Sequence, residues 1–170
     1  MMDVDSIVDS ALEILAPLIK DTNRPIPRRI DVRILPEDLV TAVKALQDAG
    51  WGYLVAITGM DHPAPLSEAG VPEGEGSLEV LYSFGNGAVC LFLRVSVPYS
   101  AARVPTLCGL IPSATLYERE LMELYGVEVV GTPDTRRLIV ADDWPEGIYP
   151  MRKSYQDKRT MRLDEEGTRV

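Results

Sequence analysis

Two runs of strand-forming residues joined by an Asn-Gly turn constrain the fold of this chain more than any other feature of its sequence. Residues 78–84 and 88–97 are rich in β-branched, aromatic and other apolar side chains. Between them, Gly85 precedes Asn86 and Gly87, and an Asn-Gly pair readily adopts the positive φ angles that a tight hairpin turn needs. We therefore expect an antiparallel β-hairpin here.

Further helices and strands are expected on both sides of the hairpin. Apolar residues recur at helical spacing in residues 3–19, and Pro36 and Gly50 bracket a second helical pattern. Ser113 is suited to cap another helix, and Gly126 is suited to end it. The sequence also predicts a break at residues 21–27, a strand at 29–35, a strand buried on both faces at 51–58, a long surface loop from 62 to 77, a helix at 104–111 and a short strand at 127–130.

These patterns predict one α+β domain over residues 1–141, in which helices cover a mixed β-sheet that contains the antiparallel hairpin. The strands at 29–35 and 51–58 could pair in parallel, because a helix separates them. Beyond residue 141 the apolar density falls, and two prolines interrupt any regular element. We expect residues 142–170 to form an extended C-terminal arm that binds a partner protein.

Composition and charge exclude several classes of protein. Hydrophobic residues make up 46% and charged residues 25% of the 170 residues, which is ordinary for a folded globular domain. The formal net charge is −9, and all of the acid excess precedes Asp134, so no basic face is available for nucleic acid. No apolar run approaches the ~20 residues of a membrane-spanning helix, and the N-terminus is acidic rather than basic, unlike a secretory signal. We expect a soluble cytoplasmic protein.

Few residues are suited to catalysis or metal binding. One histidine, His62, and two cysteines, Cys90 and Cys108, are too few for a multi-histidine centre or a four-cysteine iron–sulfur site. His62 falls in the expected surface loop, and Asp61 beside it would point elsewhere on an extended segment, so we expect no catalytic role. A small enzyme working through these two residues is the alternative. Both cysteines fall in apolar stretches and are expected to pack there as small apolar residues.

Three glutamates, Glu118, Glu120 and Glu123, lie close together in the helix expected between Ser113 and Gly126. Glu120 and Glu123 share one face of that helix, but the Glu-x-x-His pair of di-iron bundles is absent. The pattern is typical either of a solvated helix face or of a surface that binds a partner protein.

Ordered blocks of residues then follow one another between residues 117 and 155. The blocks are Glu118-Arg119-Glu120, Tyr125-Gly126, Gly131, Pro133-Asp134, Arg136-Arg137, Asp143-Trp144, Arg152-Lys153 and Tyr155. They resemble the most recognisable stretch of the C-type subunit family of respiratory NADH:quinone oxidoreductase, and a weaker likeness covers residues 30–155. Thr132, Thr135 and Glu123 stand where this family usually has His, Leu and Asp. Similar proteins also occur in membrane-bound energy-converting hydrogenases and formate hydrogenlyases.

The resemblance implies a subunit that holds no flavin, metal or iron–sulfur centre of its own. It would be a scaffold in a proton-translocating oxidoreductase complex of the electron-transport chain, packed against the large quinone-site subunit, which is of the D type, and other hydrophilic-arm subunits. It would lie on the cytoplasmic side of the cell membrane, and the isolated chain would be inactive. The alternatives are the equivalent subunit of an energy-converting hydrogenase or formate hydrogenlyase, and a free adaptor protein.

The residues expected at the partner interface belong to the matching blocks, and arginine and tryptophan are the types most enriched among interface hot spots. Their other interpretation is internal, with ion pairs that fasten the tail to its own domain. The candidate interface residues are Glu118, Arg119, Glu120, Asp134, Arg136, Arg137, Asp143, Trp144, Arg152, Lys153 and Tyr155.

Overall fold

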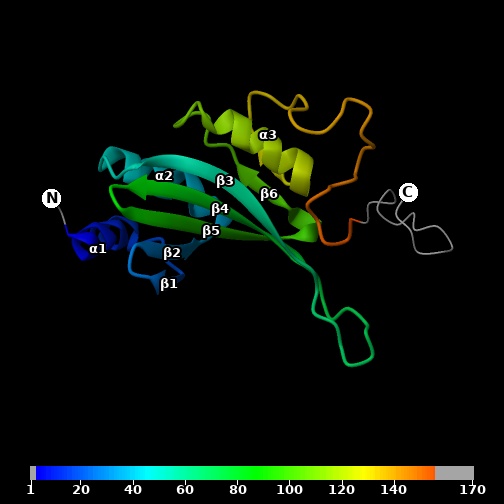
Figure 1. Ribbon diagram of the computed structural model, residues 1–170, viewed down its shortest axis with the longest axis horizontal. Coiled ribbons are helices and arrows are strands. Elements are labelled where there is room, and N and C mark those ends of the chain that lie inside the picture. The colour runs from blue at the N-terminus through cyan, green and yellow to red at the C-terminus, as the bar shows by residue number, and fades with distance from the viewer. Residues whose placement is uncertain (1–2, 156–170) are drawn as a thin grey trace, which may run out of the picture.

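The computed structural model describes residues 3–155, which form an α+β fold (Figure 1). Three α-helices and seven β-strands account for its regular structure within this range. In chain order they are α1 Val4–Leu15, β1 Asp21–Ile26, β2 Arg29–Ile34, α2 Leu39–Asp48, β3 Tyr53–His62, β4 Ser77–Asn86, β5 Val89–Pro98, β6 Arg103–Pro105, α3 Ala114–Tyr125 and β7 Glu128–Val130, with 3-10 turns at Pro36–Asp38 and Tyr99–Ala101.

The five long strands form one mixed sheet in the order β1-β2-β5-β4-β3. The hairpin of β4 and β5 is antiparallel, as the Asn-Gly turn predicts, and Asn86 pairs with Val89 at its end. β2 pairs in parallel with β5, whereas the other pairs of this sheet are antiparallel. The predicted mixed sheet is confirmed, but the parallel partner of β2 is β5 and not the strand that follows α2.

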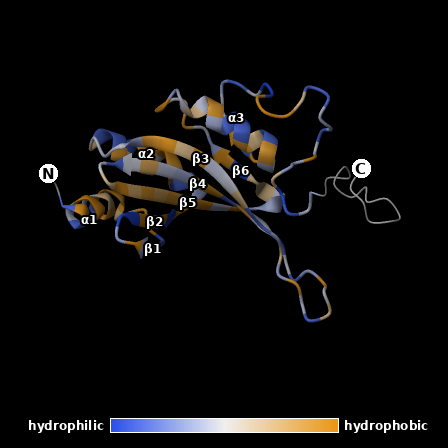
Figure 2. Ribbon diagram, viewed as in Figure 1, coloured by the Kyte–Doolittle hydropathy of each residue, from blue (hydrophilic) through white to orange (hydrophobic). Residues whose placement is uncertain are grey.

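One face of the sheet is packed against helices. The side chains of Val32, Leu91 and Val80 point to this face and are fully buried. They join the buried residues of α1, α2 and α3 in a single apolar cluster, and the central strands are among the most hydrophobic parts of the chain (Figure 2). The opposite face carries most of the charged side chains of the sheet, among them Arg29, Asp31, Glu79 and Arg94.

β3 lies at the edge of the sheet, so the prediction of a strand buried on both faces is wrong. Tyr53 is 69% exposed and Val55 43% exposed at its beginning. Its apolar run resembles a central strand, but α3 packs on only one of its faces. On that face the ring of Tyr125 packs against Gly59. A Cβ atom added to Gly59 would lie 2.7 Å from atoms of this ring.

Two further predictions differ from the structure. Residues 21–27 were expected to be irregular, but six exposed residues form β1 by pairing with β2 through their backbones. Residues 104–111 were expected to be helical, but Arg103–Pro105 forms β6, which pairs in parallel with β7. β1 carries no alternating pattern, because all six of its residues are exposed and backbone pairing holds it, whereas β6 is too short for a pattern to show.

The third helix ends as predicted at Gly126, which adopts a left-handed φ of 67°. Ser113 precedes the helix but makes no capping hydrogen bond with its side chain. After β7 the chain continues without a helix or strand to Tyr155, and this segment runs back over α3 (Figure 1). We call residues 131–155 the strap. The predicted boundary after residue 141 stays a prediction, and residues 156–170 of the predicted arm lie outside the described residues.

None of the helices within residues 3–155 is both long and apolar enough to cross a membrane.

Candidate interaction surface

The candidate interface residues come together where the strap crosses α3, but most of their side chains are engaged within the chain. Glu118, Arg119 and Glu120 lie on α3, and the other eight belong to the strap. The structure therefore shows how this surface is built, while its binding to a partner stays a prediction.

Glu118 is buried, with 2% of its surface exposed, so the solvated-face interpretation is wrong for this residue. Its carboxylate accepts hydrogen bonds from the Thr106 hydroxyl at 2.7 Å, the Leu107 amide at 2.7 Å and the Cys108 thiol at 3.2 Å. It thereby holds the turn between β6 and α3. A signal was present in the sequence, because Glu118 falls on the same helical stripe as the buried Leu121 and Tyr125.

Glu123 and Arg119 hold the strap to α3 through its backbone. The Glu123 carboxylate accepts hydrogen bonds from the amides of Leu138, Ile139 and Val140, the last two at 2.8 and 3.1 Å. Arg119 donates to the carbonyl oxygens of residues 136 and 137 at 2.7 and 2.6 Å. Glu120 is half-buried on the same helix.

Asp134 and Arg136 form an ion pair at the start of the strap, with 2.7 Å between Nη2 and Oδ2. The Arg136 side chain, followed by its backbone amide, holds the pKa of Asp134 well below its usual range, and Arg119 approaches the same carboxylate at 3.4 Å. Arg136 is nevertheless 84% exposed. It is the candidate arginine whose charge is most open to a partner.

Arg137 organises the middle of the strap. Its guanidinium donates to the carbonyl oxygens of Ala141, Asp142 and Trp144 at 2.6, 2.8 and 2.6 Å. The Trp144 indole donates to the carbonyl of Ile148 at 2.8 Å, and its ring lies 5.9 Å from that of Tyr155. Asp143, beside Trp144, is exposed. These contacts give an irregular segment a defined conformation.

Arg152 fastens the end of the strap to the C-terminus of α3. It donates to the Tyr125 carbonyl at 2.7 Å, and its guanidinium lies over the rings of Tyr99 and Tyr149 at 5.1 and 4.8 Å. Such contacts of a cation with aromatic rings are worth about 0.5–1 kcal/mol at exposed sites.

Asp61 makes a further attachment that the sequence did not reveal. Its buried carboxylate accepts hydrogen bonds from the Tyr99 hydroxyl and, at 2.7 Å, from the Lys153 amide. Burial and then the hydrogen bond to Asp61 raise the pKa of Tyr99 to about 12. His62 points to the opposite face of β3, so the two residues form no catalytic pair. The Lys153 side chain is exposed.

Several polar groups of the strap bond to α3 or within the strap, while four of its large aliphatic side chains are exposed. Leu138 is 42% exposed, Ile139 54%, Ile148 42% and Met151 53%. Sequence reasoning did not name these four residues, because it favoured arginine and tryptophan as the types that dominate interfaces.

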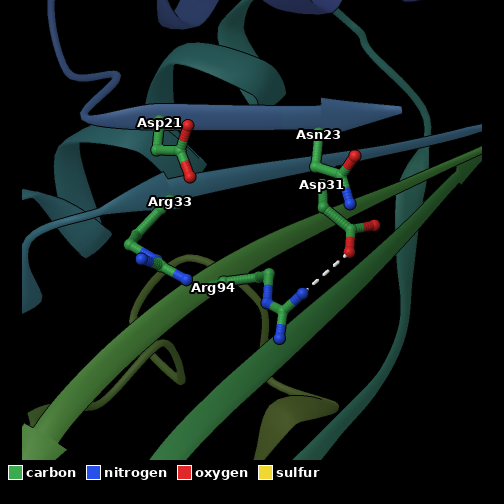
Figure 3. Close-up of a pocket in the computed structure, with 5 residues that line it drawn as sticks. All are labelled: Asp21, Asn23, Asp31, Arg33 and Arg94. Carbon is green, nitrogen blue, oxygen red and sulfur yellow. Dashed lines mark hydrogen bonds and ion pairs between the residues drawn. The ribbon is translucent and has the colours of Figure 1, made fainter. Parts of the chain in front are cut away.

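A second polar cluster lies on the open face of the sheet, centred on Arg94 of β5. Its guanidinium contacts Asp31 of β2 at 3.0 Å and Glu79 of β4 at 2.6 Å, and both carboxylates are almost fully buried. Arg29 also pairs with Asp31 at 2.6 Å, and His62 lies 3.3 Å from Glu79. Figure 3 shows Arg94 reaching Asp31 across a shallow hollow that Asp21, Asn23 and Arg33 complete.

The stability contributed by Glu79 should depend on pH. Burial raises its pKa, but the hydrogen bond and charge of Arg94 outweigh burial and lower the pKa below its usual value. A lowered pKa means that the ionised form stabilises the fold above the unfolded pKa of about 4.3, and that this stability is lost as the pH falls further. The difference in melting temperature between the wild type and Glu79→Gln should therefore narrow between pH 7 and pH 3.5. If the difference in melting temperature instead stays constant from pH 7 to pH 3.5, the ionised form of Glu79 does not stabilise the fold.

The two cysteines lie in different surroundings. Cys90 is exposed on β5, so the prediction that it packs in the core is wrong, because it faces away from the helices. Cys108 is half-buried, and burial followed by the nearby Glu118 carboxylate raises the pKa of its thiol. Within the described part of the chain, no three His, Cys, Asp or Glu side chains are grouped so that they could hold a metal ion.

Comparison with known proteins finds a matching family, related sequences and solved structures with the same fold. The family described as respiratory-chain NADH dehydrogenase, 30 Kd subunit, matches residues 32–161. The C-type subunit of NADH-quinone oxidoreductase from Neorickettsia sennetsu is 33% identical over 133 residues, which cover 76% of this chain and 64% of that protein. Hydrogenase-4 component G of Escherichia coli K12 is 28% identical over 93% of this chain.

The chain spans only part of several relatives, namely 29% of hydrogenase-4 component G and 15% of formate hydrogenlyase subunit 5, both from Escherichia coli K12. Two solved structures share its fold. A chain of the archaeal membrane-bound sulfane sulfur reductase superposes with a TM-score of 0.72 at 22% identity, covering 98% of each chain. The trypsin-resistant fragment of Nqo5 superposes with a TM-score of 0.60 at 23% identity, covering 78% of this chain and 99% of the fragment.

Proposed function

The chain belongs to the family of the 30 kDa subunit of respiratory-chain NADH dehydrogenase, and from this membership we propose that it is a scaffold subunit of a membrane-associated oxidoreductase complex. In this proposal it holds no redox centre, packs against the large quinone-site subunit on the cytoplasmic side and is inactive alone. The complex is an NADH:quinone oxidoreductase that translocates protons.

The observation that carries the proposal is the outward direction of the aliphatic side chains of the strap. In a free domain, an irregular segment with exposed Ile139 and Met151 would gain from turning them inward. The contacts of Glu123, Arg119 and Arg137 oppose this by holding the backbone of the strap in one conformation. A fixed backbone that presents apolar side chains is suited to protein binding, because little conformational freedom is lost when a partner covers it.

The proposal changes the role of the predicted interface residues. Arg119, Arg137, Arg152 and Trp144 act as positioning residues that hold the strap, as their contacts within the chain support. The partner contacts the aliphatic side chains instead, with exposed Arg136 beside them. In this proposal, partner contact applies to Arg136, and attachment of the strap to its own domain applies to the positioning residues.

A second candidate function is the equivalent subunit of a membrane-bound hydrogenase or formate hydrogenlyase. It is supported by the similarity to hydrogenase-4 component G, which extends over 93% of this chain. The two candidates predict the same scaffold role and differ in the partner. Mass spectrometry of the large subunit recovered with the chain distinguishes them.

Replacing Ile139 and Ile148 together by aspartate should reduce recovery of the large subunit about tenfold or more, because two apolar contacts become buried charges. The tagged full-length chain is expressed in its source cells, and the large subunit is quantified by mass spectrometry after purification from solubilised membranes. Val40→Asp is the matched control, since Val40 is an exposed apolar residue of α2, far from the strap in sequence.

Both variants should melt within a few degrees of the wild type, because the replaced side chains are exposed. Undiminished recovery of the large subunit with the double variant would rule out the strap as its binding surface. Recovery of the wild-type chain without any large subunit would favour the free adaptor.

A further inference from the structure

The connection between β3 and β4, residues 63–76, projects from the body of the molecule (Figure 1). We call it the finger. It was expected to be a surface loop, and it does lie at the surface. Its length alone is unusual for a compact domain, in which such long connections commonly serve a function.

The base of the finger is attached to the turn after β5. Tyr99 donates its amide to the Gly76 carbonyl at 3.1 Å, and the Glu75 carboxylate accepts hydrogen bonds from the amide and the hydroxyl of Ser100. Gly76 packs so closely on the Tyr99 ring that a Cβ atom would lie 2.4 Å from it. The direction of the finger is therefore set by specific contacts.

The tip of the finger has its own hydrogen bonds. Ser67 donates its amide to the Val71 carbonyl at 2.8 Å and accepts the Val71 amide on its hydroxyl at 3.1 Å. Gly70 donates to the Ser67 carbonyl at 2.9 Å with a φ of 76°, a conformation that suits glycine. Leu66 and Pro72 form an antiparallel bridge across the tip. The tip is thus a preformed turn.

This turn presents large apolar side chains to solvent. Leu66 is 65% exposed and Val71 is 60% exposed. Single exposed apolar residues are common, but these two flank one tight turn at the end of a projection. Burying such side chains is worth about 1.5–3 kcal/mol each. Because the turn is already formed, little conformational entropy is lost on binding, and little of the free energy gained by burying these side chains is offset.

The charges of the finger indicate the kind of surface that receives it. Residues 63–76 contain Glu68, Glu73 and Glu75 and no lysine or arginine. Glu68 stands between Leu66 and Val71 in the sequence, Glu73 follows Val71 by two residues, and both glutamates are exposed. An anionic membrane surface would repel this segment, whereas lysine or arginine side chains around an apolar pocket would attract it.

We propose that the finger inserts Leu66 and Val71 into an apolar pocket with a basic rim on a second protein subunit of the complex. This inference rests on the proposed function, because it requires that the chain works within such an assembly. The finger would be a second docking element, separate in sequence from the strap. It would also fix the orientation of the chain, since two contacts far apart restrict rotation about either one.

The test places a photoreactive benzoylphenylalanine at position 66 of the tagged full-length chain in its source cells. We expect irradiation to join position 66 to one site on a subunit that co-purifies with the wild-type chain. Adding Glu68→Lys and Glu73→Lys should lower the yield of this adduct about tenfold or more, because the basic rim would then repel the finger. The same photoreactive residue at position 40 of α2 should not form that adduct.

Each other outcome overturns the inference. If purification recovers the large subunit but position 66 forms no adduct with a protein, or charge reversal leaves the adduct unchanged, the finger docks in no basic-rimmed pocket and the proposed function stands. If the purified chain binds vesicles of phosphatidylglycerol and phosphatidylethanolamine through Leu66 and Val71, a membrane is the partner. If purification recovers no large subunit, the proposed function and this inference both fail.

Discussion

Arg94→Met should lower the free energy of unfolding by about 3–5 kcal/mol, the usual cost of removing one partner from a buried ion pair. Methionine keeps much of the side-chain volume but removes the guanidinium. Among the described residues, Glu79, whose side chain is 5% exposed, then retains only His62 as a partner, while Asp31 retains Arg29. The melting temperature at pH 7 should fall by roughly 6–20 °C for a chain of this size.

Arg33→Met is the matched control for this prediction. Arg33 pairs with Arg94 in the register of β2 and β5, and it forms no ion pair among the described residues. Its replacement should change the unfolding free energy by no more than about 0.5 kcal/mol. Equal effects of the two substitutions would show that the cluster contributes no more than an ordinary surface arginine.

Replacing both charges should cost less than replacing Arg94 alone. In the Arg94→Met background, Glu79→Met removes the unpaired buried carboxylate, and an apolar pair of similar size can be as stable as the ion pair it replaces. The double variant should therefore be more stable than Arg94→Met. Arg94→Met and Glu79→Met are also measured singly against the wild type. If the loss of stability in the double variant equals the sum of the two single losses, Arg94 and Glu79 do not interact.

The parts of the fold that local patterns determine were predictable from the sequence. The hairpin turn at residues 85–87 and the helix that ends at Gly126 are cases in which one residue type favours one backbone conformation. β1, by contrast, depends on pairing with β2 and carries no side-chain pattern. The parallel pairing of β2 with β5 joins segments about 60 residues apart, and a single sequence does not show which distant strands will pair.

The residues named for the candidate surface lie on α3 and the strap, but most of their side chains contact the chain itself. A resemblance over residues 117–155 identified the region, and the family match agrees with it. Composition then favoured arginine and tryptophan as partner contacts, yet Arg137 and Trp144 donate to carbonyl oxygens of the strap itself. Backbone carbonyls of an irregular segment need donors, and no sequence pattern shows which side chain will supply them.

The charged residues of the open sheet face were partly predictable. The strand pattern of residues 29–35 alternates apolar with charged residues, which places Arg29, Asp31 and Arg33 on one face of β2. That Asp31 meets Arg94, 63 residues further along, depends on the sheet order. Burial of the carboxylates follows from this meeting, because neighbouring strands bring their long side chains over them.

Glu118→Ala should destabilise the chain by about 3 kcal/mol, because it leaves the Leu107 amide, the Thr106 hydroxyl and the Cys108 thiol without their shared acceptor. The Leu107 amide matters most, since its residue is 1% exposed and a buried donor without a partner costs about 1–3 kcal/mol. Urea unfolding of the purified full-length chain measures this effect.

Glu123→Ala is the matched control on the same helix. Glu123 also accepts hydrogen bonds from three donors, but these are amides of the strap at residues 138–140, which water can reach. Its loss should cost less than about 1 kcal/mol in unfolding free energy, while loosening the strap should make its backbone easier to cleave with a protease. The two substitutions would then differ in their cost to the unfolding free energy, because Glu118 bonds to buried groups and Glu123 bonds to a surface segment.

The comparison also separates a structural role of Glu118 from a role in binding. If Glu118 only supports the turn, Glu118→Ala protein that remains folded at low temperature should recover the large subunit as well as the wild type does. Glu123→Ala should show the reverse, with a stable core and weaker recovery, because the aliphatic side chains of the strap are no longer held in position. A Glu118 variant of unchanged stability and reduced recovery would instead place this carboxylate at the partner interface, as the sequence alone suggested.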